Sequence, residues 1–502
     1  MKNIFNIIKF VIIIFAIVFT YLAFDKHQGN SIYYLLFSFL INLLFIYSLN
    51  TEKLFFETFF AGLIWLGFWF KYTMSLMYMR GTIYDSGPLF NIINIDKALI
   101  PSMVAISAIF LGFMIRQKFL NFNFNIKDQR SFFEKIYLNN KNLIMFLFIL
   151  FFTIIAYFNF RFNIYQKGFI YPHNISSILV NFVKWMILFG LTTFSCFFVY
   201  TEVLRLKEFS LFTVLVAFTE VFISYTSMLS RLLILAHASI AYSYCKYWNE
   251  IKNKTVFFLC LFSLIITMFL ANNYFSNDYR IKYATDISSY EKHKDNYITK
   301  KKKLEKLLES KNYTKEQLLE LETKSDTSRG KTSLFLIINR WIGIESMLAI
   351  VSTDKLNFDL FFESLKERKI TGNDTFYEST FYIDYDHGKN VMFGEKRILK
   401  GNTLPGIITF LFYSGSYYFL FISMFILTLV FCLLEIICLR VSNKNMIFAA
   451  FISFTTAFRL SNFGYAPSDS HLYLISIVAS IFLMFILSNY RSSFFNKLFR
   501  LN

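Results

Sequence analysis

The sequence predicts an all-α polytopic membrane protein with about twelve transmembrane helices and one large extracytoplasmic loop between the ninth and tenth spans. Three observations predict this fold class. Of the 502 residues, 56% are hydrophobic and the mean hydropathy is +0.47, which excludes an ordinary soluble domain. Apolar stretches near the roughly 20 residues that a bilayer requires recur along the chain. Residues 273–403, by contrast, form one long polar insertion with 23 basic and 20 acidic residues.

The apolar stretches divide the chain into three parts. Residues 1–272 hold the first nine spans, 273–403 the loop domain, and 404–502 the remaining spans. No small-residue cleavage pattern follows the first stretch, so we expect a retained anchor. The stretch 404–438 is too long for one span, and its first part, TLPGIITFLFYSGS, is predicted to enter as a broken or re-entrant piece. The candidate spans are 4–24, 31–49, 54–79, 98–115, 143–160, 176–200, 209–227, 231–246, 255–272, 404–438, 445–460 and 470–489.

The distribution of lysine and arginine predicts the orientation. If the N-terminus is cytoplasmic, the short inner loops and tails hold 19 basic residues and the short outer loops only 7. Both termini are therefore expected inside and the insertion outside. All five prolines then lie towards the outer side, where irregular backbone can line a cavity.

The insertion is expected to contain two helical parts. Residues 291–325 carry leucines at helical spacing among many charges, which indicates a solvated hairpin turning near Asn312. Residues 331–352 form an apolar pattern that predicts a helix packed against the membrane domain. In such a helix Arg340 and Glu345 would lie about 140° apart. Residues 371–403 show little regular pattern.

Ionisable residues inside the apolar stretches are the first functional candidates, because charge at membrane depth is costly. Lys71, Lys184, Glu57 and Glu220 lie within predicted spans. The alternative for each is a snorkelling or ion-paired structural charge, and this alternative is strongest for Glu57.

A second set consists of arginines at the predicted outer boundary. Arg231, Arg340 and Arg459 stand beside Ser, Gly, Asn or Trp, and Arg280 follows the ninth span. The guanidinium fork matches phosphate oxygens in a bidentate manner, so converging arginines are typical of a pyrophosphate site. We therefore predict that these four residues and Lys71 bind such a group; isolated surface cations are the alternative.

Other chemistries fit the sequence poorly. It has no P-loop, no dinucleotide fingerprint and no HExxH motif, its six histidines are scattered, and its five cysteines lie in or beside apolar spans. An isolated DYD at Asp384 to Asp386 lies among many acids, and no metal role is expected for it. We expect no cofactor, no metal and no nucleic-acid partner. The loops GTIYDSGPLFN and YQKGFIYPHN are rich in Gly and aromatic residues, as carbohydrate-contacting loops often are.

Six segments in order along the chain carry a resemblance to a known family. They are GFWFKYTMSL at 67–76, IYQKGFIYP at 164–172, SMLSR at 227–231, RWIGIES at 340–346, PGIITFLFYSGS at 405–416 and RLSNFGYAP at 459–467. With these segments, the many spans and the single large outer loop, the chain resembles the bacterial oligosaccharide repeat-unit polymerases, the O-antigen polymerase group. The insertion 291–325 is not part of that pattern.

The resemblance implies a GT-C-like glycosyltransferase of the bacterial inner membrane whose active site faces the periplasm. It would act without a nucleotide sugar, transferring a glycan from one undecaprenyl-pyrophosphate carrier to a sugar hydroxyl on another lipid-linked repeat. Membrane lipid and a chain-length regulator would be its partners. A flippase for the same lipid-linked glycan, a ligase-like transferase and a scaffold of an export complex remain alternatives.

In such a reaction, preorganised cations would neutralise the leaving pyrophosphate. A base would assist removal of the acceptor proton. We assign Arg340 and Glu345 as catalytic residues, with Glu345 the first candidate for the base. Asp469 and His471 are the further candidates for the base. Together with Tyr165 and Gln166 they are also the candidates for contact with the acceptor.

Overall fold

A computed structural model gives the structure of the chain over most of its predicted membrane domain. Within the described residues every regular element is helical, and no strand occurs among them. Seven of these helices are long and apolar enough to cross a membrane, judged by length and composition. The described residues are 2–49, 54–79, 81, 83, 95–119, 131–162, 164–165, 176–206, 210–229, 271, 275, 338, 340–368, 375–381 and 403–490.

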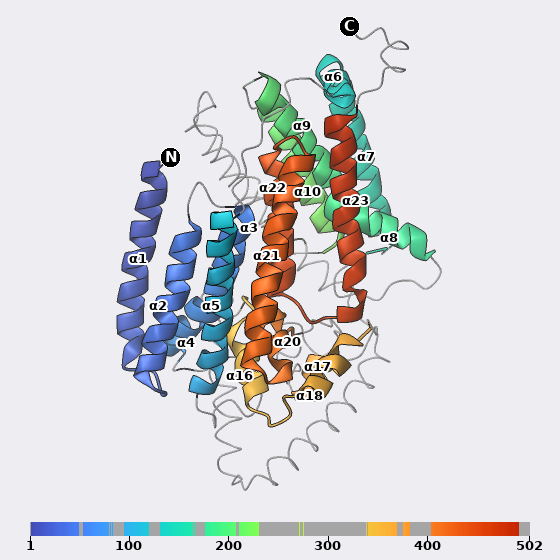
Figure 1. The fold of residues 1–502 in the computed structure, drawn as a ribbon. Helices are drawn as coiled ribbons and strands as arrows, with labels where there is room; N and C mark the ends of the chain where they lie inside the picture. Colours follow the sequence, from blue (N-terminus) through green and yellow to red (C-terminus); the bar gives the residue numbers. More distant parts are fainter. Residues whose placement is uncertain are drawn as a thin grey trace.

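The first half of the bundle encloses one apolar core. Its helices pack α1 on α2, and α2 on both α3 and α5, and the later helix α21 packs along α5 (Figure 1). Helices α3, η1 and α4 form one continuous path, and the π-helical turn η1 lies in its middle. The bounds are α1 (Lys2–Phe24), α2 (Ser31–Ser48), α3 (Phe55–Trp65), η1 (Leu66–Phe70), α4 (Lys71–Tyr78), α5 (Asp96–Phe119) and α21 (Tyr417–Val441).

The second half encloses another core. Here α10 packs on α7 and α9, and α23 packs on α9 and α6. A second π-helical turn, η3, joins α8 to α9. The bounds are α6 (Phe132–Asn139), α7 (Lys141–Arg161), α8 (Ser177–Trp185), η3 (Met186–Gly190), α9 (Leu191–Leu206), α10 (Leu211–Ser227) and α23 (Ser470–Asn489).

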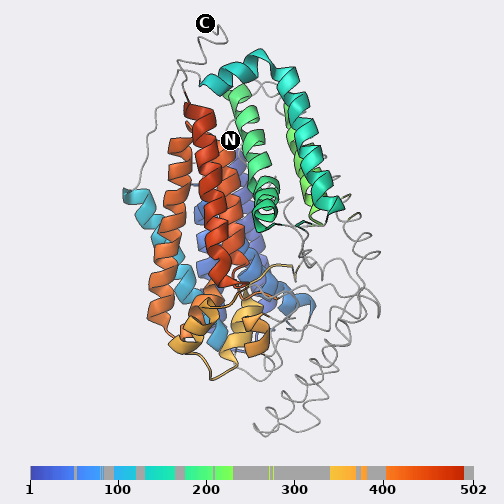
Figure 2. The same ribbon diagram turned by 90° about the vertical axis from the view of Figure 1, so that its right-hand side faces the viewer.

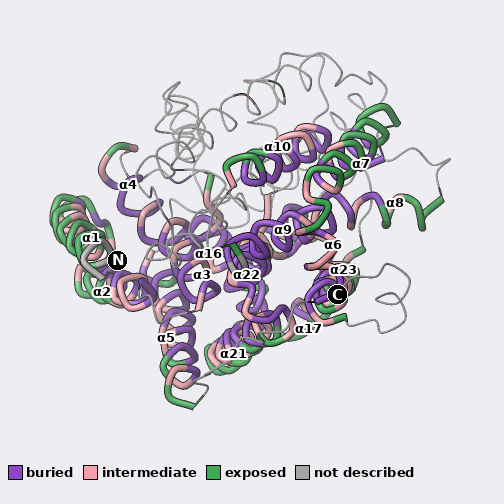
Figure 3. The backbone as a smooth tube through the Cα atoms, turned by 90° about the horizontal axis from the view of Figure 1, so that it is seen from above, coloured by how far each residue is buried: buried purple, intermediate pink, exposed green. Residues whose placement is uncertain are grey.

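Helix α22 (Met446–Ser461) lies between the two halves (Figure 3). It contacts α3, α21 and α9, and it is buried on nearly every side. This burial explains why its sequence, MIFAAFISFTTAF, is apolar or small around the whole helix. Side chains of α22 contribute to both cores, so this helix joins the halves into one bundle.

Buried carboxylates reinforce each half. In the first, Arg116 Nε donates to Glu57 Oε1 at 2.7 Å, so Glu57 has the ion-paired structural role named as its alternative. In the second, Lys141 lies 2.7 Å from Glu202, which also accepts hydrogen bonds from Tyr137 and Thr213. Buried charges of this kind are stable only when they are paired and hydrogen-bonded.

Short helices gather at one end of the bundle, opposite the start of α1 and the end of α23 (Figures 1 and 2). They are α16 (Ile344–Val351), α17 (Phe358–Leu365), α18 (Phe376–Thr380), α20 (Gly406–Leu411) and the 3-10 turns η5 (Phe412–Ser414) and η6 (Pro467–Asp469). We call this the short-helix end.

The stretch 404–438 is divided here. Helix α20 and turn η5 end at Gly415, whose φ of 68° lies in the left-handed region that glycine adopts easily. Helix α21 then begins at Tyr417, and Ser416 caps it by accepting from the N–H of Phe419. The candidate span 231–246, the span 255–272 apart from residue 271, and the hairpin 291–325 lie outside the described residues.

Candidate functional site

A buried ion pair connects α4 to the first turn of α16 and to the backbone just before it. The ammonium of Lys71 lies 2.9 Å from Glu345 Oε1 and donates to the carbonyl oxygen of Trp341 at 2.9 Å. The carboxylate of Glu345 also accepts from the N–H of Gly343, at 3.2 and 3.1 Å. Both side chains are almost fully buried, with Lys71 1% and Glu345 5% exposed. The pair therefore fixes the backbone of residues 341–345 against the membrane helices.

Two glycines bring the same backbone segment against η1. A Cβ on Gly67 would collide with the carbonyl of Ile342, and a Cβ on Gly343 would collide with the backbone of Gly67. Neither position has room for a side chain. Single π-helical turns such as η1 widen a helix locally and are frequent at functional sites.

Helix α16 is shorter than the predicted helix 331–352. It begins at Ile344, and Arg340 lies in the turn before it, so Arg340 and Glu345 do not share one helix at 140°. The physical reason is the contact at Gly343, which a continuous helix could not make with Gly67. Residues 331–337 lie outside the described part of the chain.

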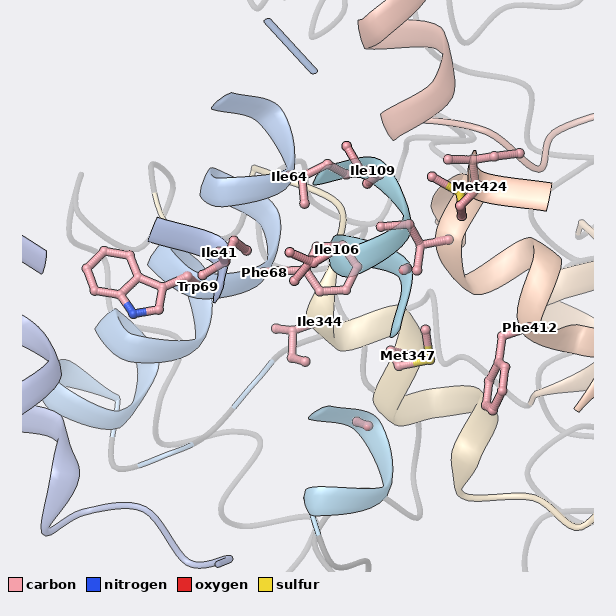
Figure 4. Close-up of a cluster of buried hydrophobic side chains, with 14 of the residues drawn as sticks. Ile41, Ile64, Phe68, Trp69, Ile106, Ile109, Ile344, Met347, Phe412 and Met424 are labelled. Atoms are coloured by element: carbon pink, nitrogen blue, oxygen red, sulfur yellow. The ribbon is translucent and has the colours of Figure 1, made fainter. Parts of the chain in front are cut away.

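The position of α16 agrees with a segment docked into the membrane domain. Ile344 and Met347 point into a buried cluster with residues of α3, η1, α5 and α21 (Figure 4). Arg340, at the edge of this buried segment, is exposed. The structure thus holds Arg340 at the short-helix end, on a turn whose following residues, 341–345, are fixed against the membrane helices.

A second group of polar residues lies where α8, α22 and α23 meet at the short-helix end. Lys184 Nζ lies 5.2 Å from the centre of the Tyr165 ring, and the guanidinium of Arg459 lies 5.7 Å from the centre of the Tyr473 ring. Arg459 repels and Asp469 attracts the ammonium of Lys184, so these charges share one environment. All five side chains are half-buried. We call Tyr165, Lys184, Arg459, Asp469 and Tyr473 the cationic cluster.

Hydrogen bonds position the members of the cationic cluster. Asn159, at the end of α7, accepts from the N–H of Tyr165 at 2.8 Å and donates to its carbonyl at 3.1 Å. The indole of Trp185 donates to Ser476 and Ser480 and so anchors α8 to α23 beside Lys184. Such packing and hydrogen bonding hold Tyr165 and Lys184 in defined places.

The cationic cluster has unused hydrogen-bonding capacity. Among the described residues, neither Nε of Arg459 nor the hydroxyl of Tyr473 makes a hydrogen bond, although both atoms are buried. Burial raises the pKa of Tyr165 to about 12, and Arg459 opposes that rise only in part. The phenol of Tyr165 therefore remains a hydrogen-bond donor at neutral pH.

The Lys71–Glu345 pair and the cationic cluster are joined by one junction at Gly406. A Cβ placed there would lie 3.3 Å from Ile342 and 2.9 Å from the carbonyl oxygen of Ser461. Gly406 also donates its N–H to Phe463 at 3.0 Å. Arg340 lies two residues before Ile342, and Arg459 lies two residues before Ser461. The fold therefore brings both predicted arginines to the region of this junction.

His471 is the second residue of α23, directly after the 3-10 turn η6 that carries Asp469. Its Nδ1 is 2.8 Å from the carbonyl oxygen of Ser468, whose hydroxyl donates to the carbonyl of Glu367. His471 is exposed. Ser468 of η6 therefore links the start of α23 to Glu367, in the segment after α17.

The structure brings together most of the predicted site residues that it describes. Lys71 and Glu345 are bound to each other, and Arg459, Tyr165 and Asp469 lie in the cationic cluster. Sequence reasoning noted Lys184 as an ionisable residue but did not join it to this set, and it missed Tyr473. The signal for Lys184 was its place before a Trp in an apolar span. Arg231, Arg280, Gln166, Asp384 and Asp386 lie outside the described residues.

No group of three or more His, Cys, Asp or Glu side chains that could hold a metal ion occurs within the described ranges. Fold and composition together define a helical membrane protein. Comparison with protein-family models, curated proteins and solved structures gives no match to this chain.

Proposed function

We propose that this protein is a glycosyltransferase that polymerises oligosaccharide repeat units carried on undecaprenyl pyrophosphate. One observation carries the proposal: two half-buried cations, Lys184 and Arg459, lie on tyrosine rings at the end of a membrane bundle, with open donors beside them. A lipid pyrophosphate presents its charge at the depth of the membrane surface. Its sugars present apolar faces that stack on aromatic rings.

The leaving group is a lipid pyrophosphate, so the site must stabilise the negative charge that develops on it. Arg459 binds the pyrophosphate through its guanidinium fork, and Lys184 supplies a second, compact positive charge. The anomeric carbon then loses its bond to the phosphate oxygen, which keeps the electron pair. Cations held in place before the reaction stabilise this developing charge without reorganisation. Arg340, on the turn before α16 and near the same junction, would contact a second phosphate or the second carrier.

The acceptor hydroxyl forms the new glycosidic bond and must lose its proton. Asp469 is the better candidate for the base, because it lies near Lys184 and is half-buried rather than enclosed. Glu345, the first candidate from sequence, is buried against Lys71 and holds the N–H of Gly343. We therefore reassign Glu345 and Lys71 as positioning residues that act through the turn carrying Arg340.

The test is a set of substitutions in cells that lack the native gene. Arg459→Ala, Arg459→Lys and Lys184→Met should each shorten the polysaccharide ladder. One charge-assisted contact that strengthens in the transition state is worth a factor of roughly 10²–10³ in rate. Arg459→Lys should fail because a point charge cannot replace a bidentate fork. Ladder length is read by gel, and protein level by blot.

The control is Arg440→Ala. It removes an exposed arginine from the last turn of α21, at the end of the bundle opposite the short helices, and should leave the ladder unchanged. A polymerase defect should leave single repeat units accessible from outside. Loss of a flippase should instead leave them on the inner side of the membrane, and that result would remove the polymerase proposal. A normal ladder from Arg459→Ala at normal protein level would exclude the cationic cluster as the site.

A further inference from the structure

Glu220 is unusual among the buried acids of the described residues. It lies midway along α10 and is fully buried. Glu57, Glu202 and Glu345 each have a cationic partner. The remaining buried carboxylates, Asp96, Glu134, Glu378 and Glu435, accept hydrogen bonds from backbone N–H groups. Within the described ranges Glu220 has neither a cation within ion-pair distance nor a backbone donor.

Hydroxyl groups from two helices surround this carboxyl group. Ser224, one turn further along α10, donates to Glu220 Oε1 at 2.9 Å. Thr192 and Ser195 of α9 lie near the same carboxyl group, and Ser195 makes no hydrogen bond to it. Within the described part of the chain, the second carboxyl oxygen of Glu220 and the hydroxyl oxygen of Ser195 are buried and make no hydrogen bond.

The local helix geometry adds an independent observation. The π-helical turn η3 ends at Gly190, just before Leu191 and Thr192, and it contacts α10. The neighbouring Thr193 returns its hydroxyl to the carbonyl of Phe189 at 2.8 Å, so it takes no part in the group around Glu220. Irregular helical turns of this type are frequent at functional sites.

A buried carboxylate without a cationic partner is too costly to remain charged on its own. Oxygen donors alone, with a single negative charge, match a hard monovalent cation, because hard cations prefer carboxylate and hydroxyl oxygens. We propose that Glu220, Ser224, Ser195 and Thr192 bind one sodium ion between α9 and α10. This site is separate from the cationic cluster, and it makes the stability of the second half of the bundle depend on sodium.

The experiment is thermal unfolding of the purified full chain in detergent, in sodium chloride against choline chloride and potassium chloride at equal ionic strength. A cation that binds only the folded state raises the midpoint as its concentration rises. We expect a saturable rise with sodium alone, and saturable uptake of radioactive sodium with the same midpoint concentration. A midpoint that responds equally to all three salts, or to none, would overturn the proposal in favour of a protonated carboxyl.

The variants separate ion binding from packing. Glu220→Gln keeps the shape of the side chain and should abolish the response to sodium. Ser195→Ala and Ser224→Ala should each weaken sodium binding by about tenfold, since a contact to a charged group is lost. Thr193→Val is the matched control, because its hydroxyl is already bonded within its own helix, and it should keep the full response. If Glu220→Gln does not fold, Ser195→Ala and Ser224→Ala test the site in its place. An unchanged sodium affinity in both variants would overturn the proposed sodium site.

Discussion

Lys71 and Glu345 are two charges inside a membrane bundle whose contacts position the backbone beside them. Each satisfies the other, and each also binds backbone of the same short segment, at Trp341 and Gly343. A buried pair contributes little net stability compared with apolar side chains of similar size. What it supplies is a defined position, since only one arrangement of residues 341–345 satisfies both groups.

The first prediction is a double-mutant cycle on this pair. Lys71→Met alone leaves a buried carboxylate, and Glu345→Met alone leaves a buried ammonium, so each should cost about 3–5 kcal/mol of unfolding free energy. The double variant should cost clearly less than the sum, because it leaves no unpaired charge. Thermal unfolding in detergent measures all four proteins. Lys97→Met, which removes an exposed lysine, serves as the control, and additive losses would contradict the buried pair.

At the scale of elements, the π-helical turn η1 and the segment before α16 form one contact. Gly67 and Gly343 meet backbone to backbone, which permits Lys71 to reach Trp341 and Glu345. Hydrophobic periodicity predicts α3 and α4 as one span but does not indicate the turn between them, because a π-helical turn changes the register by only one residue. The same contact sets the start of α16, which no local pattern in 331–352 predicts.

The second prediction concerns that glycine contact. Gly67→Ala places a Cβ against the carbonyl of Ile342, where backbone cannot move aside cheaply. Such overpacking should cost about 1–3 kcal/mol in unfolding free energy and should shorten the glycan ladder by displacing the turn of Arg340. Gly62→Ala is the matched control on the same helical path. Its Cβ would meet only the ring of Phe45 at 3.3 Å, and alanine favours helix, so stability should hardly change.

The measurement is the midpoint of thermal unfolding together with ladder length at matched protein levels. Equal effects of Gly67→Ala and Gly62→Ala would show that the contact with Ile342 does not restrain the structure. A loss of ladder length from Gly67→Ala without a loss of stability would instead assign the contact entirely to the position of Arg340.

At the scale of the whole molecule, two apolar cores joined by α22 carry a site built from distant parts of the chain. Hydropathy was enough to predict a helical membrane protein and an apolar helix over 445–460, where α22 is found, because both follow from composition and length. The sequence could not predict that Lys184 lies near Arg459 or that Lys71 pairs with Glu345. Both relations depend on which helices lie side by side. Residue type named these side chains as candidates, and packing alone decides their partners.

The last prediction is the orientation of this bundle. The loops at 25–30 and 462–469 lie with the short helices at one end, and the junction of α6 and α7 lies at the other (Figures 1 and 2). The excess of 19 basic residues over 7 predicts that the first end faces the outer side of the membrane. In a variant without the five native cysteines, Gln28→Cys and His471→Cys should react with an impermeant maleimide on intact spheroplasts. Asn140→Cys should react only after permeabilisation.

The three positions are exposed, so accessibility to solvent is not limited by packing. The design separates the fold from its orientation. If Gln28→Cys and His471→Cys were labelled from opposite sides, the arrangement of the helices would be wrong. If both were labelled only after permeabilisation, the bundle would be inverted. The cationic cluster would then face the cytoplasm, where a polymerase of externally displayed glycans has no substrate.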